Sequence, residues 1–187
     1  MDKRELVERA GRGDHDAFAL LVGTSIGRLD GAARLILRDP DLARDAVQDG
    51  FLKAWRSLPA LRDPERFDAW LRRLVVRSCF DTLRRRGRRA VEVELTPLHS
   101  PVLDDIASIV ADHDLLDGAL RRLVPESRAI VVLHYYLGLP LPDVAATLGI
   151  PLGTAKSRLH RSLSAMRSSI DSSLAPTAVP VAGGQYA

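Results

Sequence analysis

Apolar residues recur along the chain at a spacing close to 3.6 residues, which is the period of an amphipathic α-helix. No alternating run of apolar and polar residues bounded by turn residues indicates a β-strand. The pattern therefore predicts an all-α protein. Prolines, glycines and capping residues divide the chain into helices expected at about residues 3–10, 14–37, 41–55, 66–86, 114–123, 125–137, 142–148 and 152–170.

The helix expected over 41–55 has two contrasting sides. One side is predicted to be buried and carries small and apolar residues, namely Leu42, Ala46, Val47, Gly50, Phe51, Ala54 and Trp55. The opposite side is acidic but contains a leucine, and its members are Asp41, Asp45, Gln48, Asp49 and Leu52. An apolar residue among exposed acids is the unusual feature of this helix.

The helix expected over 66–86 combines an apolar stripe with a basic face. The stripe is predicted to be buried and consists of Phe67, Trp70, Leu71, Leu74, Val75, Ser78 and Cys79. The basic face continues into an arginine run, and its residues are Arg73, Arg77, Arg84, Arg85 and Arg88, interrupted by Asp81. Such a face favours a polyanion through phosphate contacts and counterion release. The alternative is a solvated, arginine-rich helix end.

Charge is distributed unevenly over the 187 residues, although the net charge is only +3. Residues 1–90 hold 20 bases and 14 acids, residues 91–113 hold five acids and no Lys or Arg, and residues 114–187 hold seven bases and five acids. We therefore predict two small domains, 1–90 and 112–171, joined by a flexible acidic linker over 91–111 and followed by a disordered tail over 172–187.

The linker acids suggest a further hypothesis. The linker could fold back on the basic domain and suppress its binding to DNA through four acids, Glu92, Glu94, Asp104 and Asp105. Neutralising these acids would then tighten DNA binding at low salt. A plain solubilising linker is the alternative.

The spacing of Ala145, Gly149 and Ala155 is typical of a helix-turn-helix. A small residue lies at the helix crossing, a glycine can take a positive φ in the turn, and a modest apolar residue packs the second helix on the first. The second helix is expected to expose Lys156, Ser157, His160 and Arg161 toward a DNA major groove. The alternative is a helical hairpin whose polar face meets only water.

Composition and motifs argue against other classes of function. Hydrophobic residues make up 46% of the chain and charged residues 27%, which excludes a chain disordered throughout. No apolar run approaches the roughly 18 to 20 residues that span a bilayer, and the amino terminus lacks a signal peptide, so we predict a cytoplasmic protein that is not membrane-inserted. The single Cys79 is predicted to be a buried structural thiol. We find no metal site, cofactor motif or catalytic constellation, and we predict that the chain is not an enzyme.

Two segments together resemble a known family. Residues 41–55, DLARDAVQDGFLKAW, are similar to the second conserved region of bacterial sigma factors of the extracytoplasmic-function (ECF) group, and residues 149–161, GIPLGTAKSRLHR, resemble the end of their fourth region. The two motifs occur in the family's order with a linker between them, and the resemblance covers about residues 10–170. It implies a two-domain helical sigma factor.

The resemblance implies a role for each surface. Core RNA polymerase would bind Asp45, Gln48, Asp49 and Leu52, a role that explains Leu52 better than a solvated face does. The loop over 58–65 would capture a flipped base of the minus-ten element, and the basic face over 73–89 would hold melted strand and upstream phosphate. The minus-thirty-five element would be read by residues of the last helix, Lys156, Ser157, Arg158, His160 and Arg161. An anti-sigma factor is a further partner that the family suggests.

Some positions depart from the family pattern. Arg77 lies where family members commonly have asparagine, Arg44 where they have an acid, and Ala155 where valine is commoner.

Two rival interpretations remain at the level of sequence. A helix-turn-helix regulator that works without polymerase would leave Leu52 and the loop over 58–65 unexplained, and an RNA-binding accessory protein would not bind duplex DNA by sequence.

Overall fold

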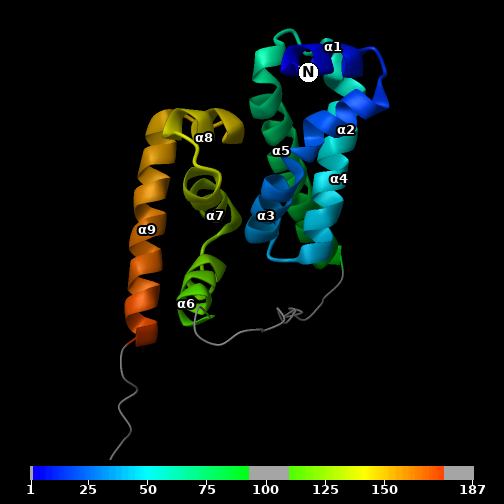
Figure 1. Cartoon of the computed structure of the whole chain (residues 1–187). Coiled ribbons are helices and arrows are strands. Elements are labelled where there is room, and N and C mark those ends of the chain that lie inside the picture. Colours follow the sequence, from blue (N-terminus) through cyan, green and yellow to red (C-terminus); the bar gives the residue numbers. More distant parts are fainter. Residues whose placement is uncertain (1, 93–109, 175–187) are drawn as a thin grey trace, which may run out of the picture.

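The computed structural model describes residues 2–92 and 110–174, and side chains over 2–88 and 114–174. All regular structure in these ranges is helical, which confirms the predicted all-α fold. The first group of helices comprises α1 (Lys3–Gly11), α2 (His15–Gly23), α3 (Ile26–Leu37), α4 (Pro40–Ser57) and α5 (Phe67–Glu92). The second comprises α6 (Val110–Arg121), α7 (Pro125–Val131), α8 (Leu141–Leu148) and α9 (Leu152–Leu174) (Figure 1).

Capping residues explain several of these boundaries. The Asp14 carboxylate accepts a hydrogen bond of 3.0 Å from the Ala17 amide, which confirms Asp14 as the predicted cap of α2. Asp39 caps α4 by accepting from the amides of Asp41 and Leu42, with Pro40 at the first helical position.

The segment predicted as one helix over 14–37 is two helices, so that prediction was wrong. The break lies at Thr24 and Ser25, where the Thr24 hydroxyl donates to the Leu21 carbonyl and the Ser25 amide donates to the Val22 carbonyl. These local bonds end α2 because hydroxyl residues compete with helix continuation.

Other boundaries also differ from the prediction. Helix α5 runs on to Glu92 and α6 begins at Val110, so the predicted linker is shorter at both ends, and the rest of it lies outside the described residues. The helix predicted over 125–137 begins as predicted with α7, but from Val132 it continues as a π-helical turn, η3 (Val132–Tyr136), in which the Leu137 amide donates to the Val132 carbonyl. Helix α9 extends to Leu174, and the remainder of the predicted tail is outside the described part of the chain.

The most extensive helix packing in the first group is between α4 and α5. A β-carbon added at Gly50 of α4 would lie 2.8 Å from both the Cα and the Cγ2 of Val75 on α5. Gly50 therefore lets the two backbones approach. The core beneath them includes Ile36, Phe67 and Leu71, each less than 2% exposed.

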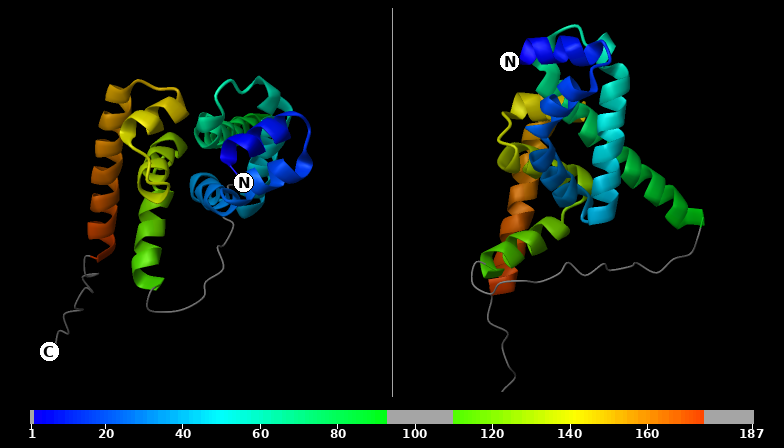
Figure 2. Two further views of the ribbon diagram at one scale, coloured as in Figure 1. Left: turned by 45° about the horizontal axis from the view of Figure 1, so that its top comes forward. Right: turned by 45° about the vertical axis from the view of Figure 1, so that its right-hand side comes forward.

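The two groups of helices contact each other directly, a feature that the sequence did not predict. Helix α3 packs against α7 and η3, and α5 packs against α8 (Figure 2). Arg128, only 8% exposed, donates to the Ile36 carbonyl of the first group at 2.9 Å and to the Leu123 carbonyl of the second at 2.9 Å. Arg38 pairs with Asp117 across the same boundary.

Two aromatic residues after α7 make different contacts, one within the second group and one between the two groups. The His134 Nδ1 lies 2.7 Å from the Leu139 carbonyl within the second group. Tyr136 instead extends to the first group, where its hydroxyl occupies the space that a β-carbon at Gly31 would fill.

Candidate functional site

The exposed side of α4 carries the four residues predicted to bind polymerase. Five buried residues fix which side of α4 faces the core: Ala43, Ala46, Val47, Gly50 and Ala54. In that orientation Asp45 and Gln48 are exposed, Asp49 is partly exposed and Leu52 is 44% exposed. The structure thus places all four on one accessible side, which we call the docking face (Asp45, Gln48, Asp49 and Leu52).

A groove of about 650 Å³ separates the docking face from the arginine run of α5. All four residues of the docking face line it from α4, and Thr82, Arg85 and Arg86 line it from α5. The side chains of Arg86 and Asp39 bridge the groove at 3.3 Å. The sequence presented these two surfaces as separate sites, but the helix pairing makes them neighbours.

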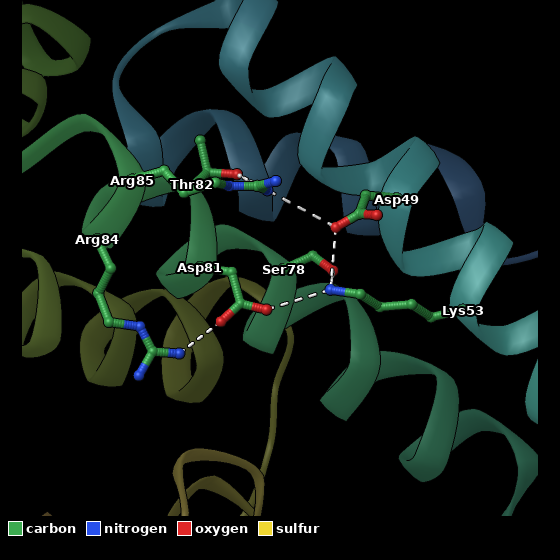
Figure 3. Close-up of polar contacts among 7 residues, drawn as sticks. All are labelled: Asp49, Lys53, Ser78, Asp81, Thr82, Arg84 and Arg85. Atoms are coloured by element: carbon green, nitrogen blue, oxygen red, sulfur yellow. Dashed lines mark hydrogen bonds and ion pairs between the residues drawn. The ribbon is translucent and has the colours of Figure 1, made fainter. Parts of the chain in front are cut away.

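A network of charged groups links α4 to α5 beside this groove (Figure 3). The Lys53 ammonium lies 2.9 Å from Asp49 Oδ2 and 3.1 Å from Asp81 Oδ2, and it donates to the Ser78 hydroxyl at 3.1 Å. The other oxygen of Asp81 accepts from Arg84 at 2.5 Å.

The network shifts the pKa values of Lys53 and Asp81 toward their charged forms. Burial acts to lower the pKa of Lys53, but hydrogen bonds to Asp49 and Asp81 outweigh it and the pKa is raised. Burial acts to raise the pKa of Asp81, but hydrogen bonds from Arg84 and Lys53 leave that pKa lowered. The charges of Lys53 and Asp81 therefore persist at neutral pH.

The five arginines of the predicted basic face are all exposed, and they fall into two sets. Arg84 pairs with Asp81, and Arg85 lies 3.8 Å from Asp49. Arg73, Arg77 and Arg88 form no ion pair with any described residue. Arg72, which no sequence pattern singled out, is half-buried with an unpartnered Nε, and burial lowers its pKa.

The loop predicted over 58–65 is anchored at both ends. It begins with a short 3-10 turn, η1 (Leu58–Ala60), in which Leu58 is buried. It ends at a second turn, η2 (Pro64–Arg66), which Asp63 caps by accepting from the Glu65 amide at 3.1 Å. The exposed residues between these anchors include Arg62.

Helices α8 and α9 have the predicted helix-turn-helix geometry. Gly149 ends α8 with φ +68°, and the Ile150 amide donates to the Ala145 carbonyl at 3.0 Å. Ala155 is fully buried at the crossing. The predicted reading residues Lys156, Ser157, His160 and Arg161 are exposed, and Arg158 is half-buried. The helical spacing of apolar residues over 152–170 predicts a buried Leu152, but this residue, the first of α9, is 38% exposed, so that prediction is wrong.

Cys79 lies in the first-group core, and burial raises the pKa of its thiol to about 12. Since the thiolate is the reactive form, iodoacetamide at pH 8 should alkylate the folded protein very slowly and the urea-unfolded protein completely. Mass spectrometry of the alkylated protein checks this expectation, and rapid labelling of the folded chain would contradict a structural role for the thiol.

Comparisons with known proteins agree with this arrangement. The family model for sigma-70 region 2 matches residues 21–89, and that for sigma-70 region 4 matches residues 113–166. The chain is 37% identical to the ECF RNA polymerase sigma factor SigM of Mycobacterium tuberculosis, over 84% of this chain and 79% of the relative. It is 33% identical to the RNA polymerase sigma-E factor of Streptomyces avermitilis, over 75% and 78% of the two chains.

Solved structures show the same fold. CnrH, determined in complex with the cytosolic domain of CnrY, is 28% identical with a TM-score of 0.66 over 91% of this chain and 99% of that one. RpoE of Bartonella quintana, crystallised with the anti-sigma factor NepR, has a TM-score of 0.73 at 24% identity over 82% and 96%. Among the described residues, no helix is both long and apolar enough to cross a membrane.

Proposed function

Because the chain belongs to the ECF group of RNA polymerase sigma factors, we propose how its surfaces divide the work of binding polymerase and reading a promoter. A sigma factor joins core RNA polymerase and directs promoter-specific initiation of transcription. We assign polymerase binding and minus-ten recognition to residues 1–90, and minus-thirty-five recognition to the helix-turn-helix within 112–171. The polymerase supplies the catalysis, and the chain itself is not an enzyme.

The docking face carries this assignment. Leu52 is exposed on a helix whose other apolar residues face the core, and Asp45 and Asp49 surround it with negative charge. A leucine exposed among acids suits a partner helix that offers apolar and basic side chains. The partner we assign to this face is core RNA polymerase.

We assign promoter DNA to the two basic surfaces. The α5 arginines, Arg73, Arg77, Arg84, Arg85 and Arg88, would hold melted strand and upstream phosphates, because guanidinium groups along one helix face can follow a phosphate backbone. The anchored loop over 58–65 would receive a flipped base. On α9, Lys156, Ser157, Arg158, His160 and Arg161 would read duplex in the major groove.

A protein partner other than polymerase is also proposed. CnrH is bound by the cytosolic domain of CnrY, and it is similar to this chain over nearly its whole length. RpoE of Bartonella quintana is bound by the anti-sigma factor NepR. We propose that this chain also has a protein partner of the anti-sigma class.

A double variant of the docking face tests the polymerase assignment. We expect Gln48→Ala/Leu52→Ala to weaken binding to core RNA polymerase at least about tenfold, because truncating a buried interface anchor costs about 1–2 kcal/mol or more. Stability should stay within about 0.5 kcal/mol of wild type, since both side chains are exposed in the free chain. Fluorescence anisotropy and urea unfolding give the two readouts.

Leu20→Ala is the matched control, because Leu20 is 54% exposed on α2, outside the docking face. Its polymerase affinity should equal that of wild type. Wild-type protein that binds duplex DNA but not polymerase would overturn the assignment in favour of a regulator acting without polymerase.

A further inference from the structure

The Lys53 ammonium is shared between two carboxylates that belong to different surfaces. Asp49 lies on the docking face, whereas Asp81 lies among the arginines of α5. The third N–H of Lys53 donates to the hydroxyl of Ser78. Because Ser78 is fully buried, this bond fixes the position of the ammonium between the two helices. Lys53 therefore fills all three of its hydrogen bonds with groups of the protein (Figure 3).

The network continues beyond Asp81 to Arg84. One oxygen of Asp81 accepts from Lys53 at 3.1 Å, and the other accepts from Arg84 at 2.5 Å. The order Asp49, Lys53, Asp81, Arg84 thus alternates in charge and runs from the docking face to the basic face. Each inner member divides its interaction between two neighbours, so strengthening one contact weakens the next.

We propose that Lys53 is a positioning residue that couples polymerase docking to DNA binding, an inference that rests on the proposed function of Asp49 and Arg84. When a basic group of the polymerase binds Asp49, Lys53 interacts more strongly with Asp81. Asp81 then holds Arg84 less tightly, and Arg84 becomes available to a DNA phosphate. In the free chain, the same contacts keep Arg84 paired with Asp81.

Thermodynamic linkage makes the coupling reciprocal. If docking at Asp49 favours DNA contact by Arg84, then DNA contact by Arg84 favours docking by the same factor. All four side chains are partly exposed, with exposed side-chain fractions of 34% for Asp49, 39% for Lys53, 36% for Asp81 and 72% for Arg84. Exposed ion pairs are weak, so we expect a coupling of about threefold to fivefold.

The first test changes Asp81 and measures binding to core RNA polymerase. In Asp81→Asn, Lys53 loses one carboxylate and interacts more strongly with Asp49, so affinity for polymerase should fall about threefold. Adding Lys53→Gln removes the competing charge, and the double variant should regain wild-type affinity to within about twofold. A purely structural role for Lys53 and Asp81 predicts the opposite, a second loss added to the first.

The second test changes Asp49 and measures DNA binding by the free full-length chain. The test is made in an Arg85→Gln background, because Arg85 lies 3.8 Å from Asp49 and would otherwise be released directly. In that background Asp49→Asn should increase affinity for a labelled single strand of about 20 nucleotides roughly threefold, because Lys53 shifts to Asp81 and releases Arg84. The slope of log affinity against log salt should steepen by about 0.7, the value of one more phosphate contact on a single strand.

Asp45→Asn is the matched control, because it makes the same charge change on the same helix and Asp45 forms no ion pair with a described residue. Equal DNA binding and equal salt slopes for the two variants would overturn the coupling, as would failure of Lys53→Gln to rescue Asp81→Asn. If neither Asp45→Asn nor Asp49→Asn changes the affinity for core RNA polymerase, the assignment of polymerase to the docking face is wrong. That outcome is distinct from loss of the coupling alone. Ellipticity and thermal unfolding establish that each variant is folded.

Discussion

Gly50→Ala is expected to destabilise the protein by about 2–3 kcal/mol, although it adds a single methyl group. The new β-carbon would lie 2.8 Å from the Val75 Cα and 3.2 Å from the Val75 backbone nitrogen. Backbone atoms cannot rotate away as a side chain can, so α4 and α5 would have to separate. These two helices form the core of the first domain and carry both the docking face and the basic face.

Tryptophan fluorescence during urea unfolding measures this effect where it occurs. Both tryptophans, Trp55 and Trp70, lie in the first domain, on α4 and α5. The fluorescence midpoint of Gly50→Ala should therefore move to lower urea. Gly27→Ala on α3 is the control, because beyond the neighbouring backbone of its own helix no described atom lies within 4 Å of the added β-carbon. Replacing glycine by alanine in a helix gains about 0.5–1 kcal/mol. Equal midpoints for the two variants would show that α4 and α5 are not closely packed at Gly50.

The features of the fold that were predicted correctly depend on neighbouring residues. Asp14 caps α2 and Gly149 adopts a positive φ, because each conformation is determined by a side chain or its absence within one turn. The exposed side of α4 follows from helical periodicity alone, so the spacing of the apolar residues was enough to place Asp45 and Leu52 on it. Local signals of this kind are fully present in the sequence.

The features that were missed depend on residues far apart in the chain. Lys53 meets Asp81 across 28 residues, and Arg128 meets Ile36 across 92, so no spacing rule could pair them. The break at Thr24 and Ser25 was missed for another reason. The apolar pattern continues through these two residues, whereas the helical backbone hydrogen bonds do not. The assignment of Asp49 to polymerase and of Arg85 to DNA likewise gave no sign that the two side chains lie 3.8 Å apart.

Arg128→Met is expected to destabilise the second domain by about 2–3 kcal/mol and to uncouple it from the first. The guanidinium is buried, and its two hydrogen bonds go to carbonyls of different domains, those of Ile36 and Leu123. Methionine fills part of the volume but leaves both carbonyls without this donor, and hydrogen bonds to charged groups contribute about 1.5–3 kcal/mol each. Burial lowers the pKa of Arg128, which reflects a desolvation cost that offsets part of the loss.

Two probes distinguish loss of coupling from general destabilisation. Fluorescence reports only the first domain, whereas ellipticity reports helices of both. Wild type should show coincident urea transitions, and in Arg128→Met the loss of ellipticity should begin before the change in fluorescence. Arg122→Met, which changes an exposed arginine of the same domain, should stay within about 0.5 kcal/mol of wild type. Coincident transitions in Arg128→Met would contradict a role for the residue in joining the domains.

The contact made by Arg128 should nevertheless be dispensable for transcription. Elements centred near minus ten and minus thirty-five are about 25 base pairs apart, or about 85 Å of duplex. A compact chain of 187 residues has a radius of gyration of about 16 Å, so its two domains cannot read both elements while Arg128 still binds Ile36. The interface must therefore open on the promoter, and Arg128→Met removes a contact that opening already breaks. At a temperature where the variant is folded, promoter opening at saturating polymerase should match wild type, and a loss of opening would mean that the contact persists in the complex.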